Sequence, residues 1–169
     1  MRAIVVYESH WGNTAAIARA IADGIGPEAA AITTDQATPD VVSSADMVVA
    51  GAPVVAFRLA TDAIRDGLYK ESGAPKTADT LHPSMRSWLE AVPAGHAPVA
   101  AFETRFRFSP GGAIGTITRE LERAGYRTLA KGQKFLVSGK FGPLKAGELE
   151  RARRWGAELA TAAQDGRPS

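Results

Sequence analysis

The sequence predicts a doubly wound α/β domain, with a parallel sheet of five strands covered by helices on both faces. Short continuous apolar runs, typical of strands buried on both faces of a sheet, alternate with amphipathic segments of helical periodicity. Such alternation indicates βαβ units. The length of 169 residues fits one domain. We expect that domain over residues 1–164, with a short tail over 165–169.

The first half of the chain contains three of the expected strands and one helix. The first strand is Ala3–Tyr7, an apolar run followed by a turn rich in Gly, Asn and Ser. Thr14–Gly24 has isoleucines at helical spacing and glycines at its end, which predicts a helix. Ala29–Thr33, rich in alanine, is expected to be a strand. Met47–Ala50 is a further buried strand, and Gly51-Ala52-Pro53 ends it.

The second half continues the alternation. A short helix is predicted at Met85–Val92, because Pro93 and Gly95 follow it. The next elements are a strand at Val99–Phe102, a helix at Ala113–Ala124 with apolar residues on one face, a strand at Phe135–Val137 and a helix at Gly147–Ala163.

One long segment, Ala56–Pro83, interrupts this pattern. It has no clear periodicity and contains several Gly and Pro residues. A stretch of that length in a small domain is usually a functional or a mobile loop. Asp62–Tyr69 is expected to form one or two helical turns within it.

Composition excludes several classes of protein. The chain has no cysteine, which excludes disulfides, thiol nucleophiles and Cys-ligated metal sites. No apolar run approaches the ~18 residues of a membrane span, and the apolar N-terminal run is too short for a signal peptide. We therefore expect a cytoplasmic protein without a membrane span.

Charge is unevenly distributed along the chain. Residues 1–84 contain 6 Lys and Arg against 10 Asp and Glu, whereas residues 85–169 contain 14 against 8. This distribution predicts either a solvated surface or a basic face for anionic ligands. No nucleic-acid-binding motif accompanies it, so no nucleic-acid partner is expected.

The loop between the first strand and the first helix is the most informative motif. It consists of Ser9, His10, Trp11, Gly12, Asn13 and Thr14. Backbone N–H groups at a helix start lack helical partners, and the helix dipole favours an anion there. The short polar side chains and the absence of Lys or Arg suit a monoester phosphate better than a triphosphate. The alternative is that Asn13 or Ser9 only caps the helix.

Three other patterns favour structural roles. Gly111-Gly112-Ala113-Ile114-Gly115 lacks the context of a dinucleotide fingerprint, so it is read as a helix start. The three histidines have no metal-ligand spacing, so no metal is expected. Ser138-Gly139-Lys140 is interpreted as a turn.

The stretch from Tyr7 to Thr14 resembles the phosphate loop of flavodoxin-like proteins, with the greatest similarity to small stand-alone flavodoxin-domain proteins of actinobacteria. Three further segments agree in order: Ala45-Asp46 through Gly51-Ala52-Pro53, Ala101 to Arg105, and Gly142-Pro143-Leu144 with residues 147–152. The resemblance implies a five-stranded sheet of order 2-1-3-4-5. In flavodoxins, FMN binds at the switch point of that strand order.

The resemblance also implies FMN held by three loops at the carboxyl ends of the strands. The first is Ser9–Thr14. The second supplies Ala52, Pro53, Val54, Val55 and Phe57, and the third supplies Glu103, Thr104, Arg105 and Phe106. The flavin ring is expected between the second and third loops, with Phe57 and Phe106 as stacking candidates.

This sequence departs from the family in two places. Val54-Val55 stand where the family usually has Thr-His, so two hydrogen-bonding side chains are missing and weaker flavin binding is expected. The third loop is extended by the basic and aromatic run from Arg105 to Phe108.

Two functions follow as hypotheses. The first is an FMN-binding redox protein that transfers electrons to a redox partner or reacts with NAD(P)H or a quinone, with no catalytic side chain assigned. Flavodoxins that act as carriers are typically strongly acidic, and the sequence pI near 9.1 argues against that mode of docking. The second is a flavodoxin-fold module that has lost its cofactor and acts in binding or regulation.

Overall fold

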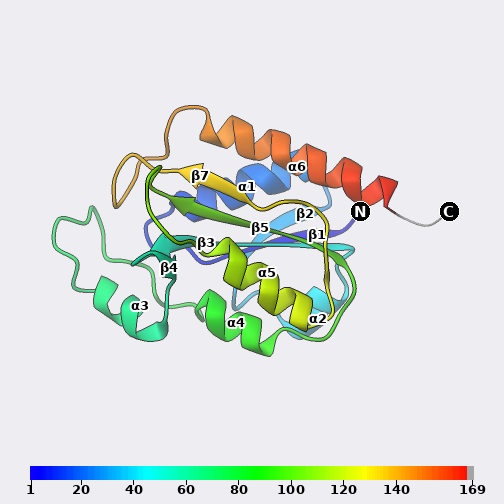
Figure 1. Ribbon diagram of the computed structural model, residues 1–169, viewed down its shortest axis with the longest axis horizontal. Helices are drawn as coiled ribbons and strands as arrows, with labels where there is room; N and C mark the ends of the chain where they lie inside the picture. Colours follow the sequence, from blue (N-terminus) through cyan, green and yellow to red (C-terminus); the bar gives the residue numbers. More distant parts are fainter. Residues whose placement is uncertain (167–169) are drawn as a thin grey trace.

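A computed structural model describes residues 1–166 and confirms the doubly wound α/β fold (Figure 1). The central parallel strands are ordered β2-β1-β3-β5-β6, and β7 also pairs with β5. The strands are β1 (Ala3–Tyr7), β2 (Ala29–Thr33), β3 (Met47–Val55), β4 (Arg58–Leu59), β5 (Pro98–Arg105), β6 (Arg127–Thr128) and β7 (Gln133–Leu136). The helices are α1 (Asn13–Ile25), α2 (Pro39–Ser43), α3 (Asp62–Leu68), α4 (Met85–Ala91), α5 (Ile114–Arg123) and α6 (Glu148–Asp165).

Alternating side chains of the central strands build two cores on opposite faces of the sheet. Val5 and Phe102 belong to the cluster under α1 and α6, which also contains Ile17, Ile21, Phe135 and Trp155. Val6 and Val48 belong to the cluster under α2, α4 and α5, with Met85, Trp88, Ile117 and Leu121. Both faces are thus covered, which explains why the strands are continuous apolar runs in the sequence.

Helices α1 and α6 pack closely through two glycines. A Cβ on Gly156 would lie 2.2 Å from the Ile21 carbonyl oxygen, and a Cβ on Gly24 would lie 1.9 Å from the Arg153 oxygen. Neither position has room for a side chain. The absence of side chains lets α6 approach the backbone of α1 along the same face of the sheet (Figure 1).

The fifth position of the sheet is filled by two short strands instead of the single expected strand. Arg127–Thr128 pairs with the beginning of β5, and Gln133–Leu136 pairs with its end. Between them the chain stays close to β5, because the Leu129 N–H donates to the Val99 carbonyl oxygen at 2.8 Å. The order predicted for five strands is otherwise that of the structure.

Two strands extend further than the sequence predicted. Residues 52–55, expected in a loop after Met47–Ala50, continue β3, and residues 103–105, expected in a loop after Val99–Phe102, continue β5. The reason is pairing: β3 and β5 remain in register to Pro53 and Thr104, and β3 then pairs antiparallel with β4. The extension of β5 was not predicted, because Glu103, Thr104 and Arg105 are polar or charged and the apolar run ends at Phe102.

Helix α2 was not predicted, although Thr38-Pro39 is a recognisable start signal. The Thr38 hydroxyl accepts a hydrogen bond from the Val41 N–H, and Pro39 occupies the first turn. In the long segment 56–83, the structure confirms helical turns as α3 and adds β4. The predicted tail begins inside α6, which ends at Asp165, and its residues 167–169 lie outside the described part of the chain.

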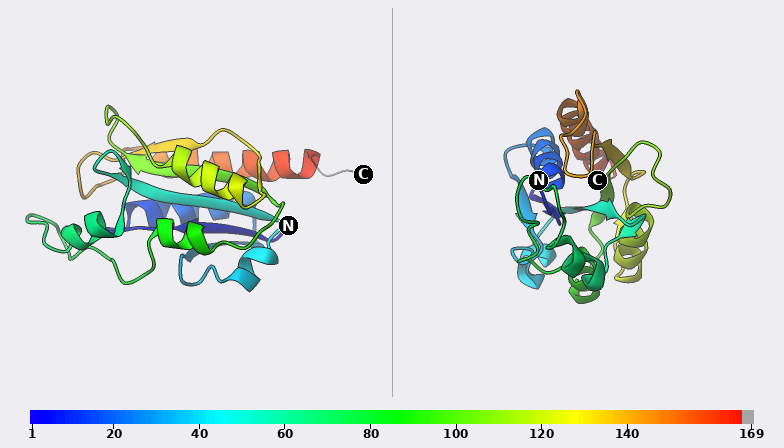
Figure 2. Two further views of the ribbon diagram at one scale, coloured as in Figure 1. Left: turned by 60° about the horizontal axis from the view of Figure 1, so that its bottom comes forward. Right: turned by 90° about the vertical axis from the view of Figure 1, so that its left-hand side faces the viewer.

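The carboxyl ends of the parallel strands meet at one end of the molecule. In Figure 1 this is the left-hand end, where α3, the loop after it and the loop between β7 and α6 gather. The left-hand view of Figure 2 shows the same loops extending beyond the sheet, at the end opposite the N-terminus and the end of α6. No helix within residues 1–166 has both the length and the apolar character needed to cross a membrane.

We predict that Gly156→Ala destabilises the protein by about 1–3 kcal/mol, because an added methyl overpacks a closed contact. Gly67→Ala is the matched control, since no atom lies within 4 Å of a Cβ at Gly67 in α3. That change should leave stability unchanged or raise it slightly. Urea denaturation of both variants measures the difference, and equal stabilities would contradict the described packing of α1 on α6.

Candidate functional site

The loop between β1 and α1 presents backbone donors at the carboxyl edge of the sheet. Gly12 precedes α1 with φ of 100°, a conformation that favours glycine. Its N–H donates to the Ser9 hydroxyl at 3.2 Å. The first N–H to reach a helical carbonyl is that of Ala16, which donates to the Gly12 oxygen. The N–H groups of the residues before Ala16 have no acceptor within the helix, and they lie at the positive end of the helix dipole.

A cavity of about 170 Å³ adjoins this loop. It brings together eleven residues that the sequence singled out: Ser9, His10, Trp11, Asn13, Thr14, Pro53, Val54, Val55, Thr104, Arg105 and Phe106. They come from three separate segments, after β1, at the end of β3 and at the end of β5. Ala56, which belongs to the second of the expected loops, also lines the cavity, and three further lining residues were not foreseen: Leu68, Val137 and Lys140.

The cavity lining has a polar and an apolar part. The polar part includes the Thr14 hydroxyl, 2.8 Å from the Thr104 hydroxyl, and the Asn13 amide, which donates to the Phe141 carbonyl oxygen at 3.1 Å. The apolar part consists of Pro53, Val54, Val55, Ala56, Leu68 and Val137. This combination suits a ligand with a polar anionic end and a flat apolar body.

Trp11 connects the loop to two other segments. Its indole N–H donates to the Lys76 carbonyl oxygen at 3.2 Å, and its ring meets the Phe141 ring edge to face at 4.8 Å. An ion pair between Lys140 and Glu71, 2.6 Å long, joins the same two segments directly. The loops after α3 and after β7 therefore contact each other beside the cavity.

Four of the residues proposed from the sequence lie outside the cavity lining. Ala52 is fully buried in the core between β3 and α5. Phe57 is 61% exposed on the turn between β3 and β4. Gly12 lines a neighbouring cavity, described below. Glu103 is only 1% exposed and points away from the cavity toward α5.

Glu103 and Arg105 form a buried structural pair. The Glu103 carboxylate accepts hydrogen bonds from the N–H groups of Ala113 and Ile114, at 2.7 and 3.0 Å, where α5 begins. Arg105 donates to Glu103 at 2.8 Å and to the Gly111 carbonyl oxygen at 2.9 Å. Although Arg105 borders the cavity, its guanidinium charge is thus neutralised by Glu103 and unavailable for attracting ligands.

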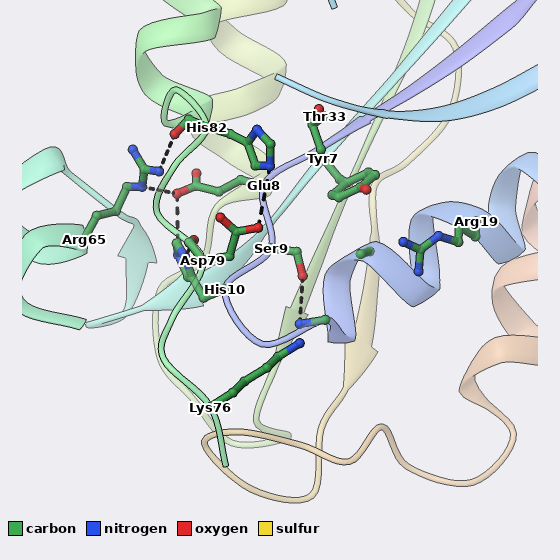
Figure 3. A pocket seen from close by; sticks show the side chains of 12 residues that line it. Tyr7, Glu8, Ser9, His10, Arg19, Thr33, Arg65, Lys76, Asp79 and His82 are labelled. Carbon is green, nitrogen blue, oxygen red and sulfur yellow. Dashed lines mark hydrogen bonds and ion pairs between the residues drawn. The ribbon is translucent and has the colours of Figure 1, made fainter. Parts of the chain in front are cut away.

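A second cavity, of about 260 Å³, lies on the other side of the loop (Figure 3). It is polar, and its lining includes Tyr7, Arg19, Thr33, Lys76, Asp79 and His82. A Cβ on Gly12 would lie 3.9 Å from the Lys76 Nζ atom, so this cation approaches the start of α1. Lys76 could not be identified from the sequence, because it lies 64 positions after Gly12 in a segment without periodicity.

A buried cluster of charged side chains separates this loop from α3. Glu8 lies between Arg65 and His10 in Figure 3, with its Oε1 atom 2.9 Å from Arg65 Nε and 3.5 Å from His10 Nε2. Its Oε2 atom accepts a hydrogen bond from the Met85 N–H at 2.9 Å. Arg65 also donates to the carbonyl oxygens of Thr80 and His82. In the described part of the chain, no group of three or more His, Asp or Glu residues is arranged to hold a metal ion.

Comparison with solved structures identifies the architecture. A flavodoxin from the domain Archaea superposes with a TM-score of 0.65 at 18% identity, covering 97% of this chain and 99% of that one. Oxidised flavodoxin 1 from Bacillus cereus gives 0.65 at 15% identity, covering 95% and 98%. The fold is flavodoxin-like.

Larger proteins contain a similar domain. Rubredoxin oxygen:oxidoreductase from Desulfovibrio gigas matches with a TM-score of 0.64 at 15% identity, covering 96% of this chain but 36% of that one. No protein-family model matches the sequence, and no curated protein matches it either. At these identities the likeness concerns the flavodoxin-like fold alone.

His10 in the flavodoxin-like domain is buried, with only 2% of its surface exposed. Burial lowers the pKa of His10 from its usual value of 6.5, and this effect exceeds the opposing attraction of the Glu8 carboxylate. The Nδ1 atom lies 3.1 Å from the Asp79 carbonyl oxygen, which holds the ring between the loop and the segment after α3.

We predict that the pKa of His10 makes stability fall as pH drops. The unfolded chain takes up a proton near pH 6.5, whereas the folded state resists it, so stability is lost as pH falls from 7.5 to 5.5. His10→Gln should flatten this dependence, while His96→Gln, at an exposed position, should retain it. Thermal unfolding across that range measures the effect, and parallel curves for all three proteins would contradict the prediction.

Proposed function

We propose that the protein binds FMN in the 170 Å³ cavity and transfers electrons through it. The observation that carries the proposal is the meeting of three strand ends on one cavity, in a flavodoxin-like fold, with phosphate-type donors at one end and an apolar lining at the other. Ligands of open α/β sheets bind at such a switch point, outside the carboxyl ends of the strands.

The donor set fits a single phosphate ester. Ser9, Asn13 and Thr14 supply neutral side-chain donors, and the first turn of α1 supplies backbone N–H groups. Lys76 adds a positive charge close to Gly12. No glycine-rich dinucleotide loop follows β1, so the chemistry of the loop favours a mononucleotide over FAD or NAD.

The apolar lining fits part of a flavin ring. A volume of about 170 Å³ is below the roughly 300–1,000 Å³ of pockets that enclose a whole drug-sized ligand. A flavin seated there would leave one ring edge at the surface, next to Phe106, which is 45% exposed. Phe106 and Trp11 are the aromatic side chains of the lining that are able to contact a ring.

FMN, when bound, would supply reversible uptake of one or two electrons, and the protein would supply orientation and electrostatics. Val54, Val55 and Pro53 would exclude water from the ring face, and Thr104 would offer a hydroxyl at the polar end. A redox partner, NAD(P)H or a quinone would react at the exposed edge. Anaerobic titration with each donor, followed by flavin absorbance, identifies which one reacts.

A second candidate function, a cofactor-free binding module, is favoured by one observation. The donors of the polar end are already used within the protein, since Asn13 bonds the Phe141 oxygen and Thr14 bonds Thr104. The Asn13 amide is left with one N–H to donate to a phosphate. The visible absorption spectrum of the purified protein, before and after incubation with FMN, separates the two functions.

We predict that Gly12→Val abolishes FMN uptake. The left-handed φ at Gly12 is strained for valine by about 1–3 kcal/mol, and the loop must distort where the phosphate is proposed to bind. Gly147→Val is the matched control, because Gly147 has φ of 83° at the start of α6 and open space around it. The control suffers similar backbone strain and should keep FMN binding. Equal flavin affinity in both variants, measured by fluorescence quenching, would show that the phosphate lies elsewhere.

Restoring one hydrogen-bonding group in the lining should strengthen FMN binding. Val54 packs into the core with its neighbours on α5 and β4, whereas Val55 follows it on the opposite side of the strand. A hydrogen bond contributes about 0.5–1.5 kcal/mol, so Val55→Thr is expected to lower the Kd for FMN roughly twofold to tenfold. Val41→Thr, the same change at a valine of α2 outside the cavity lining, serves as the control and should not lower it. An unchanged Kd for Val55→Thr in a calorimetric titration would refute this role.

A further inference from the structure

An aromatic and cationic patch lies beside the proposed flavin cavity. It consists of Phe57, Phe106, Phe108, Arg107 and Lys145, which line a surface hollow of about 420 Å³. Phe108 is 90% exposed, Phe57 61% and Phe106 45%. Three large aromatic side chains exposed together are unusual for a surface without a binding role.

The backbone that presents Phe57 is strained. Ala56 and Phe57 form the two-residue turn between β3 and β4, with φ of 48° and 66°. Both central residues of such a turn need positive φ, for which Asn-Gly is the usual choice. A non-glycine residue in this region costs on the order of 1–3 kcal/mol and persists where the surrounding structure enforces it. The retained strain therefore points to a role for the exposed ring.

The two loops of the patch are held together. The Gly112 N–H donates to the Phe57 carbonyl oxygen at 3.1 Å, and Gly111 passes so close that a Cβ there would lie 2.0 Å from that oxygen. Arg105, at the end of β5, joins both ends of this loop, because it donates to the Phe106 carbonyl oxygen at 3.2 Å and to the Gly111 carbonyl oxygen at 2.9 Å. The aromatic side chains thus project from a rigid base.

The charged side chains of the patch are all positive. Arg107 and Lys145 line the hollow, and no Asp or Glu of the described residues does. Neither cation has an ion-pair partner within residues 1–166. Arg58, next to Phe57, is likewise exposed and unpaired in this part of the chain. Aromatic residues, phenylalanine among them, and arginine are enriched in protein interfaces relative to the rest of the surface.

We propose that this patch docks an acidic protein partner, whose carboxylates surround an apolar centre that covers the three phenylalanines. A second copy of the chain is a poor occupant, because a two-fold contact would bring the cations of both patches together without any carboxylate. Complementary charge instead favours an acidic surface and accelerates its association at low ionic strength.

The patch adjoins the cavity in which we propose that the flavin binds. Phe106 and Val137 line both the hollow and the cavity, so a docked protein would lie against the exposed ring edge. The contact between the partner and the flavin edge rests on the proposed function, whereas docking itself requires no flavin. Partner docking and FMN binding can therefore be rejected independently of each other.

The test uses two electron-transfer proteins of opposite charge as probes, an acidic [2Fe–2S] ferredoxin and basic cytochrome c. Amide NMR shifts of the full, isotope-labelled chain are recorded with each probe at 20 mM and 500 mM salt, without flavin and with added FMN. We expect the ferredoxin alone to shift residues 57, 106–109 and 145 at low salt, with the shifts lost at high salt.

Two variants separate charge from aromatic contact. Arg107→Glu with Lys145→Glu should weaken ferredoxin binding at least tenfold. Phe57→Gly should weaken it severalfold while leaving the melting temperature unchanged or higher, because glycine relieves the positive φ. The matched control is Arg127→Glu with Arg154→Glu, the same change of charge at exposed positions away from the patch, and it should bind as the parent does.

The remaining outcomes overturn the proposal. These are no shifts with the ferredoxin at low salt, shifts centred elsewhere, equal binding of cytochrome c, or equal weakening by the control variant. Concentration-dependent sedimentation with shifts at the patch would identify a second copy as its occupant. If the protein docks the ferredoxin but takes up no FMN in the absorbance titration, the proposed cofactor is rejected and the proposed docking surface is retained.

Discussion

The buried ion pair between Glu8 and Arg65 is the contact on which the arrangement of the candidate site depends. Glu8 lies directly after β1, and its N–H donates to the Gly51 carbonyl oxygen of β3. Its carboxylate joins Arg65 of α3 and the N–H of Met85, where α4 begins. Removing one partner of such a pair leaves a buried charge and typically costs about 3–5 kcal/mol. One side chain thus fixes the phosphate-type loop, α3 and α4 relative to one another.

A second buried carboxylate performs the equivalent task on the other side of the cavity. Glu103 holds the start of α5 through two backbone N–H groups and also binds Arg105. Since α5 has no side-chain cap of its own, the carboxylate supplied by β5 satisfies the first turn and its dipole. The two carboxylates explain why charged residues occur within otherwise apolar strand ends. They stabilise the frame around the cavity, whose two charged lining residues, Arg105 and Lys140, are each paired with a glutamate.

The sequence was sufficient to predict what depends on local pattern. Ala3–Tyr7 and Ala29–Thr33 are strands with the predicted bounds, because apolar runs and glycine-rich turns determine them directly. The ends of β3 and β5 were misjudged, since Pro53 and Glu103 are unusual in strands and only pairing between distant segments keeps them there. The loop Ser9–Thr14 could be found from its composition alone. Lys76 and Lys140 could not, because tertiary folding alone brings them to the site.

The division of the fifth strand has a consequence for the chain in concentrated solution. An uninterrupted edge strand offers a row of free N–H and C=O groups to which a strand of another molecule can add. Here that edge is broken between Thr128 and Gln133, and Lys131 and Lys134 project along it as exposed cations. Neither short segment is long enough to template a neighbouring strand, and the lysines repel a second copy. The interruption therefore makes this edge of the sheet a poor template for strand pairing with another molecule.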